Sequence, residues 1–94
     1  MTLTARYLMA NSQLGMSYLA NGELEMAGKF LTIAKQIDPA HFSNPQLLLA
    51  EIDLRRNERE AAIGELEDYL KRHPDAPRGP TVRETIVRLK QGRD

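Results

Sequence analysis

The stretch LGMSYLANGELEMAGKFLTIAKQIDP, residues 14–39, decides the fold. Its second half repeats apolar residues at intervals of three and four positions, a spacing that predicts an amphipathic helix over residues 23–37. Asn21 and Gly22 stand before this helix and form a pair typical of turns and helix ends. Pro39 follows the helix and cannot continue it. The stretch therefore predicts a helix, a tight turn and a second helix.

Gly15 lies inside the first of these helices, which is expected over residues 4–20. A glycine in a helix interior costs about 0.5–1 kcal/mol relative to alanine. A local packing demand has to offset that cost. We therefore expect the two helices to cross closely as an antiparallel pair, with Gly15 and Ala27 at the point where the backbones approach.

The second half of the chain repeats the first at a shift of 35 positions, the distance between Pro39 and Pro74. The same shift superposes small residues on small residues and leucines on leucines: Leu14 on Leu49, Gly15 on Ala50, Leu19 on Leu54, Ala27 on Ala62, and Leu31 on Leu66. Five helices are expected in all, over residues 4–20, 23–37, from a cap at Ser43 or Asn44 to Arg56, 59–72 and 81–91. Thr81 and Glu84 fit a capping box at the start of the last helix. The predicted fold class is all-α, an array of antiparallel helix-turn-helix repeats in a single domain of residues 1–94.

Helix pairs with this period and these residues resemble the tetratricopeptide repeat (TPR) family. Leu14, Gly15 and Tyr18 match the Leu-Gly-x-x-Tyr signature of that family's first helix. Further matches are the turn glycine Gly22, the small residue Ala27 and the closing proline Pro39. The resemblance implies an α-solenoid with repeats over residues 8–41 and 43–76, and a capping helix over 81–91.

The second repeat departs from the family pattern at several places. The position that commonly holds tryptophan is Asn11 in the first repeat and Gln46 in the second. The tyrosine position of the second repeat is Asp53, and its turn glycine is Asn57. The first helix of the second repeat therefore departs from the family pattern at two positions, Gln46 and Asp53.

The composition is that of one small folded domain without a nucleic-acid partner. The 94 residues are 41% hydrophobic and 28% charged, and 13 basic and 13 acidic residues give a net charge of zero. Nucleic-acid binders normally carry a basic excess. The basic residues of the last helix, Arg83, Arg88 and Lys90, also lack an aromatic neighbour for base stacking.

No signal peptide or membrane span is predicted. The uncharged run from Tyr7 to Gly22 contains Asn11, Ser12 and Gln13, which are too polar for lipid. The first residues lack the basic and apolar regions of a secretion signal. We expect a soluble protein and take the cytoplasm as the default compartment.

The sequence predicts a non-enzymatic protein without cofactor or metal. It contains no cysteine, and its histidines, His41 and His73, each stand beside a helix-ending proline rather than among other ligands. No glycine-rich phosphate loop and no nucleophile elbow is present. The carboxylates of residues 58–68 are interleaved with basic residues, which indicates a solvated helical face.

The family resemblance implies a binding face for a protein or peptide partner, because the first helix of each pair lines the concave side of such arrays. The implied positions are Met9, Ser12, Gln13, Met16, Ala20, Leu47, Leu48, Glu51 and Arg55. Members that clamp a C-terminal carboxylate use Lys, Arg and Asn at such positions, and only Arg55 fits here. We therefore expect a helical or extended apolar segment, oriented by Glu51 and Arg55. The alternative is that Met9 and Met16 belong to the core.

The leading edge of the first helix is apolar at Leu3, Tyr7 and Leu8. A longer array would cover such an edge with a preceding helix. Two explanations follow: the chain is the C-terminal part of a larger protein, or it forms a homo-oligomer through residues 3–20. The alternative function is therefore a structural one, in which the segment assembles and has no ligand of its own.

Overall fold

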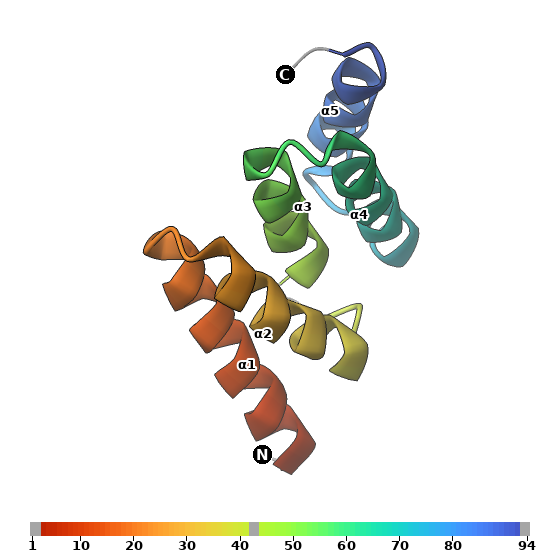
Figure 1. Cartoon of the computed structure of the whole chain (residues 1–94). Coiled ribbons are helices and arrows are strands. Elements are labelled where there is room, and N and C mark those ends of the chain that lie inside the picture. The colour runs from red at the N-terminus through yellow and green to blue at the C-terminus, as the bar shows by residue number, and fades with distance from the viewer. Residues whose placement is uncertain (1–2, 42–43, 93–94) are drawn as a thin grey trace.

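The computed structural model describes residues 3–41 and 44–92, which form five helices joined by turns (Figure 1). The helices are α1 (Leu3–Ala20), α2 (Leu24–Ile37), α3 (Pro45–Arg55), α4 (Arg59–Arg72) and α5 (Gly79–Lys90). The described residues contain no strand, so the prediction of an all-α fold with five helices is confirmed. The first four helices begin and end within a residue or so of the expected positions.

The start of α5 differs from the sequence prediction. The helix begins at Gly79, two residues before the expected Thr81, and Pro80 occupies its first turn. A proline is tolerated there because the first N–H groups of a helix have no partner within the helix. Thr81 therefore lies inside the helix, and the predicted capping box of Thr81 and Glu84 was wrong. Arg78 holds the cap position and makes no side-chain cap bond.

Like α5, α3 begins with a proline in its first turn and without a side-chain cap. Pro45 stands in the first turn, as expected, and Asn44 precedes it with a left-handed φ of 53°. The Asn44 side chain makes no cap hydrogen bond. The other predicted cap, Ser43, lies outside the described residues.

The backbone repeats the 35-residue shift of the sequence. The bounds of α2 and α4 differ by this shift, and so do the last residues of α1 and α3. The turns after α1 and α3 place Gly22 and Asn57 at positive φ, 77° and 59°. In both turns the following residue donates its N–H to the carbonyl five positions earlier, at 2.9 and 2.8 Å. Asparagine takes this conformation more readily than most residues, which explains why it can replace the turn glycine.

The close crossing of α1 and α2 is confirmed at Gly15. A Cβ atom added to Gly15 would lie 2.5 Å from Cγ of Leu31 and 3.3 Å from its backbone nitrogen. Ala27 is fully buried in the same core as Leu31. Beside this crossing the rings of Tyr18 and Phe30 stack with centroids 5.6 Å apart. Only a glycine at position 15 allows this contact, which explains why the helix carries the free-energy cost of a glycine in its interior.

Two hydrophobic clusters meet at α3. The first joins α1, α2 and α3 through Leu19, Ala27, Leu31, Leu49 and Ile52. The second joins α3, α4 and α5 through Ala50, Ala62, Leu66, Tyr69, Val82, Ile86 and Leu89. Because α3 contributes to both clusters, it holds the two helix pairs together.

Polar contacts cross the seam between the helix pairs. The Lys35 ammonium on α2 lies 2.8 Å from a carboxylate oxygen of Glu65 on α4. Gln46 at the start of α3 is fully buried. Its Nε2 donates to the carbonyl oxygen of Pro39 at 2.5 Å and to Asp68 on α4 at 2.8 Å. Buried polar groups need such partners. Gln46 therefore ties α3 to α4 and to the link that follows α2, and the Lys35–Glu65 ion pair joins the two helix pairs directly.

Candidate protein-binding site

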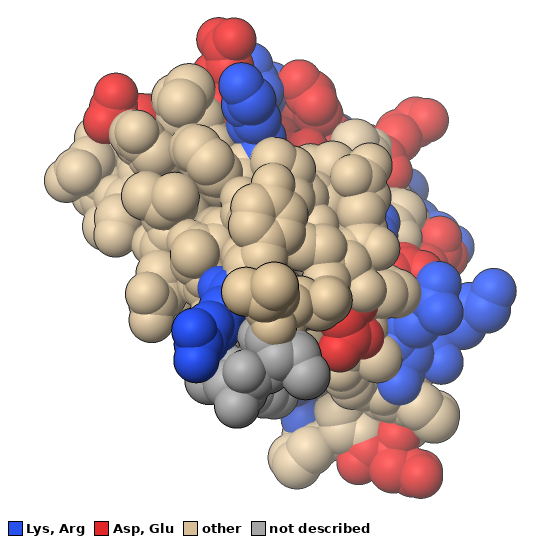
Figure 2. All heavy atoms as spheres, turned by 90° about the horizontal axis from the view of Figure 1, so that it is seen from below, with Lys and Arg blue, Asp and Glu red and all other residues tan. Residues whose placement is uncertain are grey.

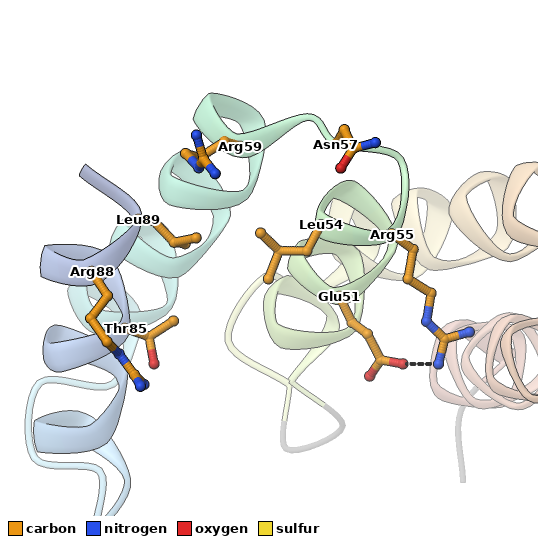
Figure 3. Close-up of a pocket in the computed structure, with 8 residues that line it drawn as sticks. All are labelled: Glu51, Leu54, Arg55, Asn57, Arg59, Thr85, Arg88 and Leu89. Carbon is orange, nitrogen blue, oxygen red and sulfur yellow. Dashed lines mark hydrogen bonds and ion pairs between the residues drawn. The ribbon is translucent and has the colours of Figure 1, made fainter. Parts of the chain in front are cut away.

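A groove of about 590 Å³ lies between α3 and α5 (Figure 3). Its lining comes from α3, the turn after it, the first residue of α4, and α5: Glu51, Leu54, Arg55, Asn57, Arg59, Thr85, Arg88 and Leu89. The groove forms because α3 and α5 both pack on α4 and share one hydrophobic cluster with it. Its size is that of an ordinary ligand cleft.

The middle of the groove is apolar. Leu54 on α3 and Leu89 on α5 are directed toward one another across it (Figure 3). Leu89 is buried against the second cluster, whereas the Leu54 side chain is 37% exposed. A large apolar side chain in a concave place gains free energy when a partner excludes water from it.

The rim of the groove is mainly cationic. Its lining contains three guanidinium groups, those of Arg55, Arg59 and Arg88, and one carboxylate, that of Glu51. Arg55 and Glu51 are one helical turn apart on α3 and form an ion pair of 2.6 Å (Figure 3). Arg88 makes no ion pair within the described part of the chain. The groove therefore offers positive charge to a ligand.

The predicted binding face is divided by the structure. Glu51 and Arg55 line the groove. Gln13, Met16 and Ala20 lie exposed on α1, and Met16 is 45% exposed, so its alternative assignment to the core is wrong. Met9, Leu47 and Leu48 are half-buried; Leu47 packs against the second cluster, and Leu48 against the first.

Two predicted surface residues are buried instead. Ser12 was expected on the partner-binding face, and Leu8 in the self-association surface. Both lie on the inner side of α1, where Leu8, Ser12, Gly15 and Leu19 follow one another at helical spacing and are all buried. A side chain on that side packs within the domain and cannot contact a partner. Leu3 and Tyr7 remain exposed, at 83% and 58%.

Sequence reasoning missed the α5 side of the groove. Arg59 and Arg88 carry much of its charge, and Thr85 and Leu89 shape its wall. The basic residues were visible in the sequence, but they were assigned to solvated helix faces. Arg88 lines the same groove as Arg55 only because α3 and α5 both pack on α4, and no local pattern specifies that packing.

The seam beside the groove holds a carboxyl with a perturbed pKa. Burial raises the pKa of Asp53, and the nearby carboxylates of Glu65 and Glu58 raise it further. The cations Arg56 and Lys35 act in the opposite direction. Asp53 lines a shallow hollow on the seam with Glu65 and Arg56, apart from the α3–α5 groove.

Neither a group of metal ligands nor a membrane-spanning helix is found in the described part of the chain. Within residues 3–41 and 44–92, no group of three or more His, Cys, Asp or Glu residues is arranged to hold a metal ion. None of the helices in these ranges has the length and apolar character needed to cross a bilayer.

Comparisons with known protein families, with curated proteins and with solved structures find no match for this chain. The resemblance to the tetratricopeptide repeat therefore stays a prediction drawn from the residues. The function has to be argued from the groove and the surface of the chain itself.

Proposed function

We propose that the chain is a non-catalytic protein-binding module whose α3–α5 groove takes an extended segment of a partner protein. The segment carries carboxylates together with at least one apolar side chain. The observation that supports this proposal is the excess of guanidinium groups over carboxylates around the exposed Leu54.

The charges of the groove favour a partner segment with negative charge. Guanidinium groups bind carboxylates through paired, charge-assisted hydrogen bonds. Glu51 already pairs with Arg55, whereas Arg88 forms no ion pair within the described residues. An acidic side chain of the partner supplies the missing carboxylate at Arg88. Positive surroundings also accelerate the encounter with an acidic segment.

The apolar part of the groove supplies most of the affinity. An apolar side chain of the partner that lies between Leu54 and Leu89 removes Leu54 from water. Charged contacts at the rim then fix the direction of the segment, and Glu51 and Arg55 keep the orienting role predicted for them.

Fluorescence anisotropy with a labelled peptide of glutamate, leucine and serine tests the proposal. The same peptide with lysine in place of glutamate and a single-stranded RNA of similar length serve as comparison ligands. We expect the acidic peptide to bind with a salt-dependent affinity, and the lysine peptide not to bind. Tighter binding of the RNA, or equal binding of both peptides, would contradict the proposal.

A matched pair of variants on α5 locates the site. Arg88→Glu reverses a charge in the groove, whereas Arg83→Glu makes the same change on an exposed residue outside the groove lining. We expect Arg88→Glu to weaken the acidic peptide about tenfold, the usual scale for a lost charged hydrogen bond. Arg83→Glu should change the affinity less than about twofold at moderate salt. Equal effects of the two variants would place the peptide elsewhere.

Met16→Glu asks whether the binding face extends to α1, as the sequence predicts. The exposed Met16 side chain lies outside the groove lining. If the partner segment reaches α1, this variant weakens binding while helicity by circular dichroism stays unchanged. If only the groove binds, the affinity for the peptide stays at its original value.

A further inference from the structure

The outer side of α1 carries an apolar stripe that nothing in the described structure covers. Its residues follow one another at intervals of four and three along the helix: Leu3, Tyr7, Ala10, Leu14 and Ser17. All five are exposed, and the Leu14 side chain is 44% exposed. We call this set the outer stripe. Its three large apolar side chains form a face that water solvates poorly.

The repeat itself shows what such a face does. A shift of 35 positions carries Ala10, Leu14 and Ser17 of the outer stripe onto Pro45, Leu49 and Ile52 of α3. These three residues of α3 are buried, and Leu49 and Ile52 belong to the cluster that α3 shares with α2. The outer stripe therefore stands in the register of a helix-packing face, and its neighbour is missing among the described residues.

The second helices of the pairs cannot provide that neighbour in a head-to-tail array of copies. Within the described residues, α2 already packs against α3, and α4 already packs against α5. The remaining end of the array, on α5, presents exposed polar residues such as Thr81, Glu84 and Arg88. That surface offers the uncharged stripe a single large apolar residue, Val87, among polar and charged groups whose desolvation against apolar side chains is costly.

The outer stripe of a second copy is its closest match in chemistry. Arg6 is the only charged residue of α1. The lower side of the molecule, where Figure 1 places α1 and α2, shows a broad area without charged side chains (Figure 2). We propose that two copies of the chain pair α1 against α1, antiparallel, about a two-fold axis that passes beside Ala10.

The antiparallel arrangement follows from the size and charge of the side chains. Ala10 is the small residue at the middle of the outer stripe, so two helices can approach closely there, as they do at Gly15. Tyr7 of one copy then lies near Leu14 of the other, and Leu3 near Ser17. The two Arg6 residues are separated by about 12 Å along the helices, at a rise of about 1.5 Å per residue. A parallel pair would place these cations side by side.

The size of the interface sets the expected strength. An 18-residue helix is about 27 Å long, so one helix face on each side buries an area near the lower limit of specific interfaces, about 1,000 Å². We therefore expect a dimer with a dissociation constant in the micromolar range. The α3–α5 groove takes no part in the contact, so the dimer and the peptide site can be tested separately.

Sedimentation equilibrium over a range from low to high micromolar concentration tests the proposal. We expect a mass that rises from one chain to two and then stays constant, because a two-fold contact closes. Leu14→Glu should leave a single-chain mass with unchanged helicity. Val87→Glu is the matched control, because Val87 is an apolar residue on α5 outside the outer stripe and is 53% exposed, against 44% for Leu14. A folded chain of single mass at high micromolar concentration, or a mass that rises without limit, would overturn the proposal.

Disulfide trapping tests the direction of the pair, and the chain contains no cysteine of its own. Ala10→Cys should give a covalent dimer under mild oxidation, because the two Cα atoms beside the axis come within bonding range, about 4.4–6.8 Å. Ser17→Cys should not, because antiparallel packing separates these residues by about 21 Å along the helices. Efficient trapping of Ser17→Cys, with or without trapping of Ala10→Cys, would show a parallel pair and refute the arrangement.

Discussion

The two helix pairs have the same backbone arrangement, but they differ in the residues at two equivalent positions beside the place where the helices of each pair cross. In the first pair Tyr18 stacks on Phe30, with the ring planes 2° apart. In the second pair the same places hold the carboxylates Asp53 and Glu65, and the charge of Glu65 adds to the burial that raises the pKa of Asp53. Lys35 of the first pair reaches across to Glu65 at 2.8 Å. An aromatic contact within one pair is thus replaced by an ionic contact between the pairs.

This difference separates the residues that define the repeat from the residues that determine the character of the surface. Both pairs keep a leucine and an alanine at the crossing, Leu31 with Ala27 and Leu66 with Ala62, and all four are buried. Around them α1 has a single charged residue, Arg6, whereas the chain from residue 55 onward holds 18 of the 26 charged residues. The same scaffold therefore presents an apolar surface on α1 and a cationic groove beside α3.

The largest expected effect comes from removing the shared leucine in either pair. Leu31→Ala and Leu66→Ala both leave a cavity in a cluster that includes α3. We expect each to lower the free energy of unfolding by about 2–5 kcal/mol, with Leu31→Ala the larger because Leu31 has no exposed surface. Chemical denaturation followed by circular dichroism measures both values. A loss below about 1 kcal/mol in one pair would show that this pair tolerates the cavity and that the repeat is unequal at its centre.

The next effect tests the crossing at Gly15, which has no counterpart of equal closeness at Ala50. Gly15→Ala places a methyl group against Leu31, so we expect a loss of about 1–3 kcal/mol despite the better helix propensity of alanine. Gly28→Ala is the matched control, because a Cβ there meets nothing within 4 Å. It should stabilise the protein by about 0.5–1 kcal/mol.

Thermal and chemical denaturation of the two glycine variants gives the sign directly. Combining Gly15→Ala with Leu31→Ala adds a diagnostic coupling, because the second change removes the atoms that the new methyl group would meet. The double variant should lose less stability than the sum of the single variants. Additive losses would mean that Gly15 is required for a reason other than contact with Leu31.

Sequence reasoning succeeded where the cause is local. The spacing of apolar residues, Pro39 and the Asn21–Gly22 turn are local signals, and they gave the helices to within a residue or so. The same reasoning placed Ser12 and Leu8 on the surface, because the side of α1 that faces inward depends on how α2 and α3 surround it. It also placed the start of α5 too late, since a helix that begins at Gly79 and Pro80 has no side-chain cap signal.

The groove could not be predicted from the sequence for a further reason. Glu51 and Arg55 were predicted from the register of one helix, and both line it. Arg88 lines the groove with them only because Val82, Ile86 and Leu89 pack α5 against α4. The stripe of α5 was predicted, but its neighbour was not specified, and a site between two elements needs both.

Substitutions in the turns after α1 and α3 should change the stability by smaller amounts, and the two turns should respond with opposite signs. Gly22→Ala puts a Cβ on a residue with φ of 77°, which costs about 1–2 kcal/mol for an L-residue. Asn57→Gly relieves the corresponding strain at φ of 59° and should be neutral or stabilising by a few tenths of a kcal/mol. Thermal unfolding of the two variants gives the comparison. Destabilisation by Asn57→Gly as large as that of Gly22→Ala would show that the Asn57 side chain has a role beyond its backbone conformation.

The smallest expected effect concerns the carboxylates that replace the aromatic pair, and its sign depends on pH. The pKa of Asp53 in the folded chain lies above its ordinary value of 3.8, so the folded state binds this proton more tightly than the unfolded state. The resulting stabilisation is present at pH values below 3.8 and is lost as the pH rises through the folded pKa. Ionised Asp53 therefore costs stability at neutral pH, and its place near the C-terminal end of α3 adds to that cost.

Asp53→Asn removes this charge without changing the shape of the side chain. We expect the melting temperature to rise by about 2 °C at pH 7, and the difference between variant and parent to shrink toward zero near pH 3. Thermal unfolding at a series of pH values measures it, and Asp75→Asn, on an exposed turn residue, is the control for removal of one negative charge. A difference that stays constant with pH would remove the electrostatic explanation, and a lower melting temperature at pH 7 would mean that Arg56 and Lys35 outweigh burial and the two neighbouring carboxylates at Asp53.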